Sequence, residues 1–146
     1  MEKYITFDDV LIKPQFSHIA SRKDVDLSTK IGDLTLNLPI ISANMDTVTN
    51  ADMGIAMAEN GAMGALHRFS SIEKNTKAFL KVKEAGHNAI ISIGLGDYEF
   101  ERAEALIAAG ANILCIDVAH GAQMSVVEQY NKIAEKHKNI AIIVGN

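Results

Sequence analysis

Short runs of apolar residues alternate with longer amphipathic segments through most of the chain. The runs lie at residues 38–43, 62–66, 88–93, 112–117 and 139–144. Because each run is apolar throughout and too short for an ordinary helix, each predicts a buried β-strand. The first residues of successive runs are separated by 24, 26, 24 and 27 residues. This regular spacing leaves room for one helix between each pair of strands.

The four intervening segments carry helix start and stop signals. Each contains a residue whose side chain can cap the first turn: Asn50, Ser70, Asp97 and Ser125. Glutamates complete capping boxes three positions after the two serines, at Glu73 and Glu128. The first three helices are predicted to end at glycines, Gly61, Gly86 and Gly110.

Buried strands joined by single helices are typical of a parallel sheet covered by helices. Two architectures fit the pattern, a complete doubly wound domain of the flavodoxin type and the first half of a (β/α)8 barrel. The sequence stops at Gly145-Asn146, directly after the fifth strand, with no helix to cover that strand. We therefore expect an α/β fold in which residues 38–146 supply four βα units and the fifth strand of a (β/α)8 TIM barrel, about half of the complete fold. Residues 1–37 are expected to form an irregular segment that leads into it.

Composition narrows the classes of function. With 14 Lys+Arg against 18 Asp+Glu the net charge is −4, which argues against a general nucleic-acid binder. The single cysteine forms no internal disulfide and no cysteine-rich zinc site, and no His-Glu-x-x-His spacing indicates another metal site. No apolar run approaches eighteen residues, and the N-terminus lacks the pattern of a secretory signal. We expect a cytoplasmic protein without membrane or nucleic-acid partners.

Polar or glycine-rich sequence follows every predicted strand. These segments are 42–48, His67-Arg68, 94–97, 117–121 and Gly145-Asn146. In both candidate architectures the active face lies at the C-terminal ends of the parallel strands. The sequence therefore predicts a functional face at this edge of the sheet.

Individual residues in these segments allow alternative roles. Asp117 can hold a ribose hydroxyl or a carboxamide, or it can cap the next helix; the first role is favoured because Ser125 already offers a cap. His67 can act as a general acid, a stacking partner or a hydrogen-bond donor, or be structural. Gly94-x-Gly96 lacks the third glycine of a dinucleotide fingerprint. Cys115 lies between two apolar residues within a strand, so we expect a packed thiol with a raised pKa, not a nucleophile.

Six motifs together carry a family resemblance. They are Thr6-Phe-Asp-Asp-Val-Leu-Ile-Lys-Pro14, residues 21–27, Pro39-Ile-Ile-Ser-Ala-Asn-Met-Asp-Thr-Val48, His67-Arg68, Asp117-Val-Ala-His-Gly121 and Gly145-Asn146. In order and spacing they resemble the first half of the IMP dehydrogenase/GMP reductase family, over essentially the whole chain. The resemblance implies a (β/α)8 barrel, usually tetrameric, that binds a purine mononucleotide, GMP or IMP, and a nicotinamide cofactor across its C-terminal face. In this family a cysteine on a loop after the sixth strand attacks C2 of the purine.

Two features resemble the reductase branch of the family. The helix that ends at Gly86 leads directly into the third strand, without the CBS modules that most dehydrogenases insert there, and Ala43-Asn-Met-Asp46 and His67-Arg68-Phe69 resemble reductases. The resemblance therefore implies NADPH-dependent reductive deamination of GMP to IMP. The alternatives are an IMP dehydrogenase, which forms XMP with NAD, and a non-catalytic half-barrel that self-associates. Because the family's catalytic cysteine loop does not occur in these 146 residues, we expect the chain alone to be inactive.

The resemblance also assigns residues to the two ligands. Those beside the cofactor are Ser21, Arg22, His67, Arg68, Asp117, Val118 and Ala119. Those beside the purine nucleotide or its reaction centre are Ala43, Asn44, Met45 and Asn146. No catalytic residue is assigned, because Cys115 does not match the position of the nucleophile. Arg22 and Arg68 are candidates to pair with the 2′-phosphate of NADP, since a guanidinium suits phosphate oxygens.

Overall fold

Five parallel strands form one sheet in the order in which they occur along the chain. The computed structural model describes residues 4–146. Residues 1–3, the first part of the N-terminus that lacks a secretory-signal pattern, lie outside the described residues. The strands are β3 (Ile41–Ser42), β4 (Met63–Leu66), β5 (Ile90–Ile93), β6 (Ile113–Asp117) and β7 (Ala141–Gly145). A flavodoxin-type sheet reverses its strand order part-way across, whereas a barrel adds each strand next to the last. The order β3-β4-β5-β6-β7 therefore selects the half-barrel.

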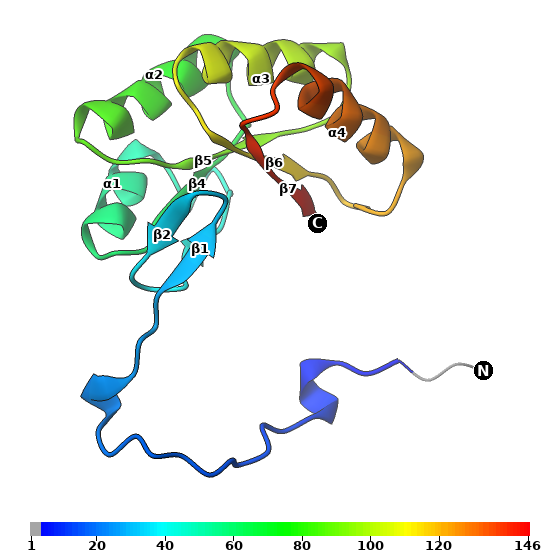
Figure 1. Cartoon of the computed structure of the whole chain (residues 1–146). Helices are drawn as coiled ribbons and strands as arrows, with labels where there is room; N and C mark the ends of the chain where they lie inside the picture. The colour runs from blue at the N-terminus through cyan, green and yellow to red at the C-terminus, as the bar shows by residue number, and fades with distance from the viewer. Residues whose placement is uncertain (1–3) are drawn as a thin grey trace.

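One helix connects each pair of neighbouring strands, as the spacing predicted. The helices are α1 (Ala51–Glu59), α2 (Ile72–Glu84), α3 (Asp97–Ala108) and α4 (Met124–Lys136). In Figure 1 they form an arc over one face of the sheet. The predicted cap of α1 is confirmed, because the Asn50 side chain accepts a hydrogen bond from the Met53 amide at 2.9 Å.

The other predicted helix starts are wrong by one or two residues. Ser71 caps α2 by accepting from the Lys74 amide at 3.2 Å, whereas the Ser70 hydroxyl accepts from the Asn75 side chain at 2.8 Å. At α3 the cap is Gly96, and Asp97 is the first helical residue. At α4 the cap is Gln123 without a side-chain bond, so Ser125 lies inside the helix. At α2 the neighbouring Ser70 and Ser71 are equivalent as caps in the sequence, and packing decides between them.

The sheet has an apolar core on each face. On the outer face, Leu66, Ile91, Ile93, Leu114 and Ile116 pack against the helices, together with the fully buried Phe79, Leu106 and Ile133. On the inner face, Met63, Ala65, Ile90 and Ile113 form a second cluster. Alternate residues of each strand thus face opposite cores, which is the strand periodicity of two applied to a sheet buried on both sides.

A β-hairpin covers the inner cluster and was not predicted. It consists of β1 (Thr29–Ile31) and β2 (Leu34–Leu36), which pair antiparallel inside the segment expected to be irregular. A signal was present, because the two residues Gly32-Asp33 between short runs are typical of a tight hairpin. Gly32 has φ +56°, and a Cβ atom there would lie 2.8 Å from Ala141 Cβ. The turn therefore needs glycine both for its conformation and for its approach to β7.

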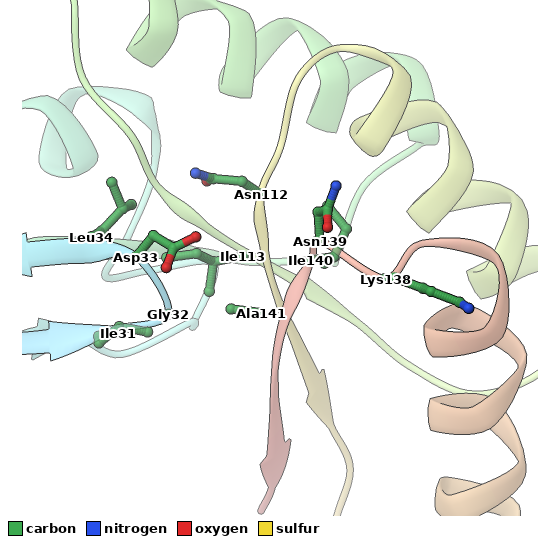
Figure 2. Close-up of a pocket in the computed structure, with 10 residues that line it drawn as sticks. All are labelled: Ile31, Gly32, Asp33, Leu34, Asn112, Ile113, Lys138, Asn139, Ile140 and Ala141. Carbon is green, nitrogen blue, oxygen red and sulfur yellow. The ribbon is translucent and has the colours of Figure 1, made fainter.

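The hairpin turn leaves a cavity of about 320 Å³ against the first residues of β6 and β7. Figure 2 shows Asp33 and Asn112 directed into this space, while Lys138 is directed away from it. The cavity lies at the N-terminal ends of the strands, and in barrels that end contributes to stability while chemistry lies at the other end.

Residues 4–28 form an extended arm that leads away from the half-barrel (Figure 1). It contains two short 3-10 helices, η1 (Phe7–Asp9) and η2 (Arg22–Asp24). Large apolar side chains on the arm, such as Phe7 and Leu11, are almost fully exposed. Among residues 4–146, no helix combines the length and the apolar character that crossing a membrane requires.

Candidate functional site

A hollow of about 280 Å³ opens at the C-terminal ends of the strands, on the inner face of the sheet. Four of the residues that the sequence assigned to ligands line it: Ala43, Asn44, Asp117 and Asn146. They come from the ends of β3, β6 and β7, which are far apart in the sequence. The parallel arrangement brings them together, because the carboxyl ends of parallel strands meet at one edge.

Asn44 is held in this hollow by a buried serine of β5. Its Nδ2 donates to Ser92 Oγ at 2.9 Å, and Ser92 is almost fully buried. No other hydrogen bond between residues 4 and 146 engages the Asn44 side chain. Its carboxamide oxygen and second N–H therefore remain available to a ligand that presents both a donor and an acceptor, as a purine edge does.

Thr49 fixes the segment that carries Ala43 and Asn44, a role that the sequence reasoning missed. Its hydroxyl oxygen lies 2.5 Å from the Ala43 carbonyl oxygen and 2.8 Å from Ser42 Oγ, and the residue is fully buried. Since the carbonyl can only accept, the single hydroxyl proton goes to Ala43 and the hydroxyl oxygen can accept from Ser42. A threonine between an apolar and a cap residue carries no sequence signal for this role.

The segment after β6 lies directly against the end of β7. The Val118 amide donates to the Gly145 carbonyl at 3.3 Å, and Asn146 Nδ2 donates to the Ala119 carbonyl at 3.0 Å. A Cβ atom on Gly121 would lie 3.1 Å from Gly145 Cα, so the close approach of the two backbones favours glycine. Within residues 4–146 no hydrogen bond or ion pair engages the half-buried Asp117 carboxylate. Asp117 thus has acceptor oxygens free for paired hydroxyl groups of a ligand.

Cys115 lines the same hollow two residues before Asp117. Burial, and secondarily the negative charge of Asp117, raise the pKa of its thiol to about 11. The expectation of a raised pKa is confirmed, and the neutral thiol is a weak nucleophile at neutral pH.

Alkylation measures this shift. At pH 7.5 we expect iodoacetamide to modify Cys115 about 100-fold more slowly than a thiol at the unperturbed pKa, and the rate to rise with pH beyond 10. Asp117→Asn removes the nearby negative charge and should accelerate the reaction, while the urea-unfolded chain serves as the unshifted control. Equal rates for the folded and the unfolded chain would contradict the shift.

His67 and Arg68 follow β4 and do not line the hollow. His67 Nδ1 accepts from the Phe69 amide at 3.2 Å, so a neutral ring carries its proton on Nε2 and presents a donor. The His67 and Phe69 rings lie nearly parallel with their centroids 6.3 Å apart, and Arg68 Cζ lies 4.9 Å from the Phe69 centroid. His67, Arg68 and Phe69 thus form a cluster of two rings and a guanidinium after β4, which we call the rim.

The structure does not bring the remaining assigned residues into the hollow. Ser21 and Arg22 lie on the arm and are exposed, with Ser21 capping η2 through the Lys23 amide. Met45 is about half exposed and Val118 and Ala119 belong to the segment against β7, but none of the three lines the hollow.

Comparison with known proteins gives the family. A family model described as IMP dehydrogenase / GMP reductase domain matches residues 4–146. The chain belongs to this family. A crystal structure of inosine 5′-monophosphate dehydrogenase from Legionella pneumophila superposes with a TM-score of 0.88 at 44% identity, covering 97% of this chain and 44% of that chain. The resemblance stated from the motifs and the half-barrel fold are confirmed.

Named relatives include both branches of the family. GMP reductase from Streptococcus agalactiae serotype V is 33% identical over 141 residues, which is 96% of this chain and 42% of the relative. Inosine-5′-monophosphate dehydrogenase from Nitrosopumilus maritimus is 49% identical over 83 residues, which is 56% of this chain and 17% of the relative. The chain thus spans less than half the length of these relatives. Members of the family are oxidoreductases that act on purine mononucleotides.

Proposed function

We propose that this chain is part of an NADPH-dependent enzyme that reductively deaminates GMP to IMP. The observation that carries the proposal is the match to GMP reductase over 96% of the chain. The local structure agrees, since only residues 85–89 join α2 to β5 and leave no inserted module. The overall reaction converts GMP, NADPH and two protons into IMP, NADP and ammonium, so the C2–N bond of the purine breaks and a C2–H bond forms.

The C-terminal face has groups of the right kind for both ligands. Asn44 offers its carboxamide to the purine edge, and Asn146 lines the same hollow. The Asp117 carboxylate is free to accept from the ribose hydroxyls of the nicotinamide half, and the nicotinamide when bound supplies the hydride. The raised pKa of Cys115 makes that thiol a weak nucleophile at neutral pH, and the position of Cys115 does not match that of the family's attacking cysteine. The 146-residue chain by itself is therefore expected not to turn over.

IMP dehydrogenation with NAD is the second candidate. The dehydrogenases match at higher identity, 49% over 83 residues and 44% across nearly all of the chain. Both reactions use a purine mononucleotide and a nicotinamide at the same face, so the present site is compatible with either direction of hydride transfer.

An assay with two arms decides between these functions. The protein encoded by the complete reading frame is supplied with GMP plus NADPH in one arm and IMP plus NAD in the other, and absorbance at the nicotinamide band is followed. NADPH oxidation that depends on GMP supports the proposal. NAD reduction that depends on IMP, without the first activity, replaces it with the dehydrogenase, and the absence of both overturns both.

Cofactor choice is expected to depend on Arg22 and Arg68. If their guanidinium groups pair with the 2′-phosphate, Arg68→Ala and Arg22→Ala each weaken NADPH binding by about tenfold and leave NADH binding nearly unchanged. Arg22 lies on the extended arm and does not line the hollow, and in this proposal it reaches the cofactor from a neighbouring subunit, as in a tetramer. Lys23→Ala, at the adjacent exposed position, is the matched control. An unchanged NADPH/NADH preference in both arginine variants would refute this pairing.

A further inference from the structure

Three polar side chains are buried between α2 and α3, next to the rim of His67, Arg68 and Phe69. Asn75 is 6% exposed, Glu99 is 8% exposed and Arg102 is 3% exposed. Burying a charged pair costs several kcal/mol of desolvation, and a well-packed apolar pair is often at least as stable. The observed bonds of these residues show what the polar groups hold in place.

A continuous path of hydrogen bonds runs from the end of β4 to the end of β5 through these side chains. Asn75 Nδ2 donates to the His67 carbonyl at 3.0 Å, and Arg102 Nη1 donates to Asn75 Oδ1. Arg102 Nε lies 3.2 Å from both Glu99 carboxylate oxygens. Glu99 Oε2 accepts from the Gly94 amide at 2.7 Å. The two strand ends are thus connected by Arg102 at the centre.

The orientation of the Asn75 side chain follows from its partners. Its Nδ2 also donates to Ser70 Oγ at 2.8 Å, so both amide hydrogens reach acceptors in the segment after β4. Exchanging the positions of oxygen and nitrogen would set an NH₂ group against the Arg102 guanidinium, donor against donor. Arg102 therefore selects the orientation in which Asn75 holds the His67 carbonyl.

Gly94 brings this path into contact with Arg68. A Cβ atom on Gly94 would lie 3.2 Å from Arg68 Cζ and from Nη1, and 3.3 Å from Glu99 Cγ. The Arg68 guanidinium thus rests on the backbone of the segment that Glu99 fixes. Arg68 Nε is buried and has no hydrogen-bond partner among the described residues, so packing, and not a direct bond at Nε, sets the position of this part of the side chain.

We propose that Arg102 is a positioning residue that sets His67 and Arg68 of the rim against the turn at Gly94. It acts through Asn75 on the segment after β4 and through Glu99 on the segment after β5. One consequence rests on the proposed function: a misplaced rim should weaken cofactor binding. The positioning itself is a property of the fold and can be measured separately.

The test uses the full 146-residue chain with Arg102→Lys, which keeps the charge but loses the planar fork that reaches Asn75 and Glu99 together. Exchange of the Gly94 amide with deuterium, followed by NMR, should accelerate about tenfold or more, while the amide of the fully buried Ile116 in β6 keeps its protection. Asn75→Ala is the second variant, which should shift the His67 ring signals and leave the Gly94 amide protected. Lys132→Met removes an exposed partner of Asp97 next to the same turn and serves as the matched control.

Gly94 exchange within twofold of the original chain, in a folded Arg102→Lys variant, would overturn the positioning role. An NADPH titration observed at the His67 ring gives the functional readout, and its response should weaken in Arg102→Lys and not in Lys132→Met. If NADPH leaves the His67 signals of the unmodified chain unchanged, the proposed cofactor site fails there, and the Gly94 exchange rate still decides whether Arg102 positions the rim.

Discussion

Replacing Arg102 by methionine is expected to lower the free energy of unfolding by about 3–5 kcal/mol, the usual cost of breaking a buried ion pair. Methionine fills a similar volume, so the main loss is electrostatic. The Glu99 carboxylate stays buried with only the Gly94 amide as its donor, and Asn75 Oδ1 loses the Arg102 donor. Urea unfolding followed by circular dichroism measures the change as a lower midpoint with an unchanged slope.

Two further variants test whether the loss of stability comes from the buried ion pair. Arg102→Met combined with Glu99→Leu removes both buried charges, and it should be more stable than Arg102→Met alone because no unpaired carboxylate remains. Lys77→Met breaks the exposed Lys77–Glu73 pair on α2 and should change stability by less than about 0.5 kcal/mol. A loss below about 1 kcal/mol for Arg102→Met would mean that water or a rearranged neighbour compensates Glu99.

The regular alternation of apolar and amphipathic segments was sufficient to predict the parallel sheet and its four helices. Boundaries were less predictable, because they depend on tertiary contacts. The run at 38–43 pairs with its neighbour only at Ile41–Ser42. Ser70 and Ser71 are equivalent as caps in sequence, and the buried Asn75 side chain engages the first while the second caps α2. The hairpin at 29–36 was missed because strands of three residues produce almost no periodic signal.

The candidate site likewise contains residues that the sequence could predict and residues that it could not. Asn44, Asp117 and Asn146 converge because each lies at or within two residues of the C-terminal end of a strand, and strand ends of a parallel sheet share one edge. The supporting residues could not be predicted. Arg102 acts across α2 and α3, which only the fold brings together, and the bond from Thr49 to Ala43 depends on the conformation of the connection between β3 and α1. Ser21 and Arg22 precede the sheet on the arm, so sequence spacing carries no information about what they approach.

Replacing Gly64 by alanine is expected to destabilise the chain by about 3 kcal/mol, the upper part of the usual range for overpacking. Gly64 lies in β4 where α1 crosses the strand. A Cβ atom there would lie 2.6 Å from Gly54 Cα and 3.3 Å from Thr49 Cγ2. The first contact is with helix backbone, which cannot turn aside as a side chain can, so α1 must move away from the sheet. Because Thr49 holds Ala43, the displacement should also loosen the segment that carries Asn44.

Gly54, the glycine of α1 that faces Gly64, is expected to tolerate alanine without a loss of stability. A Cβ atom on Gly54 would point elsewhere, toward Leu66 and Val82 at ordinary contact distances of 3.4 Å. Alanine also favours the helix by up to about 1 kcal/mol, so Gly54→Ala should be neutral or stabilising. Thermal unfolding of Gly64→Ala and Gly54→Ala therefore shows whether the loss of stability comes from the close approach of the backbone at Gly64 or from any methyl group added at this crossing. Both substitutions add one methyl group where α1 crosses β4. If both destabilised the chain equally, the close approach of a Gly64 Cβ to the α1 backbone could not be the cause of the loss.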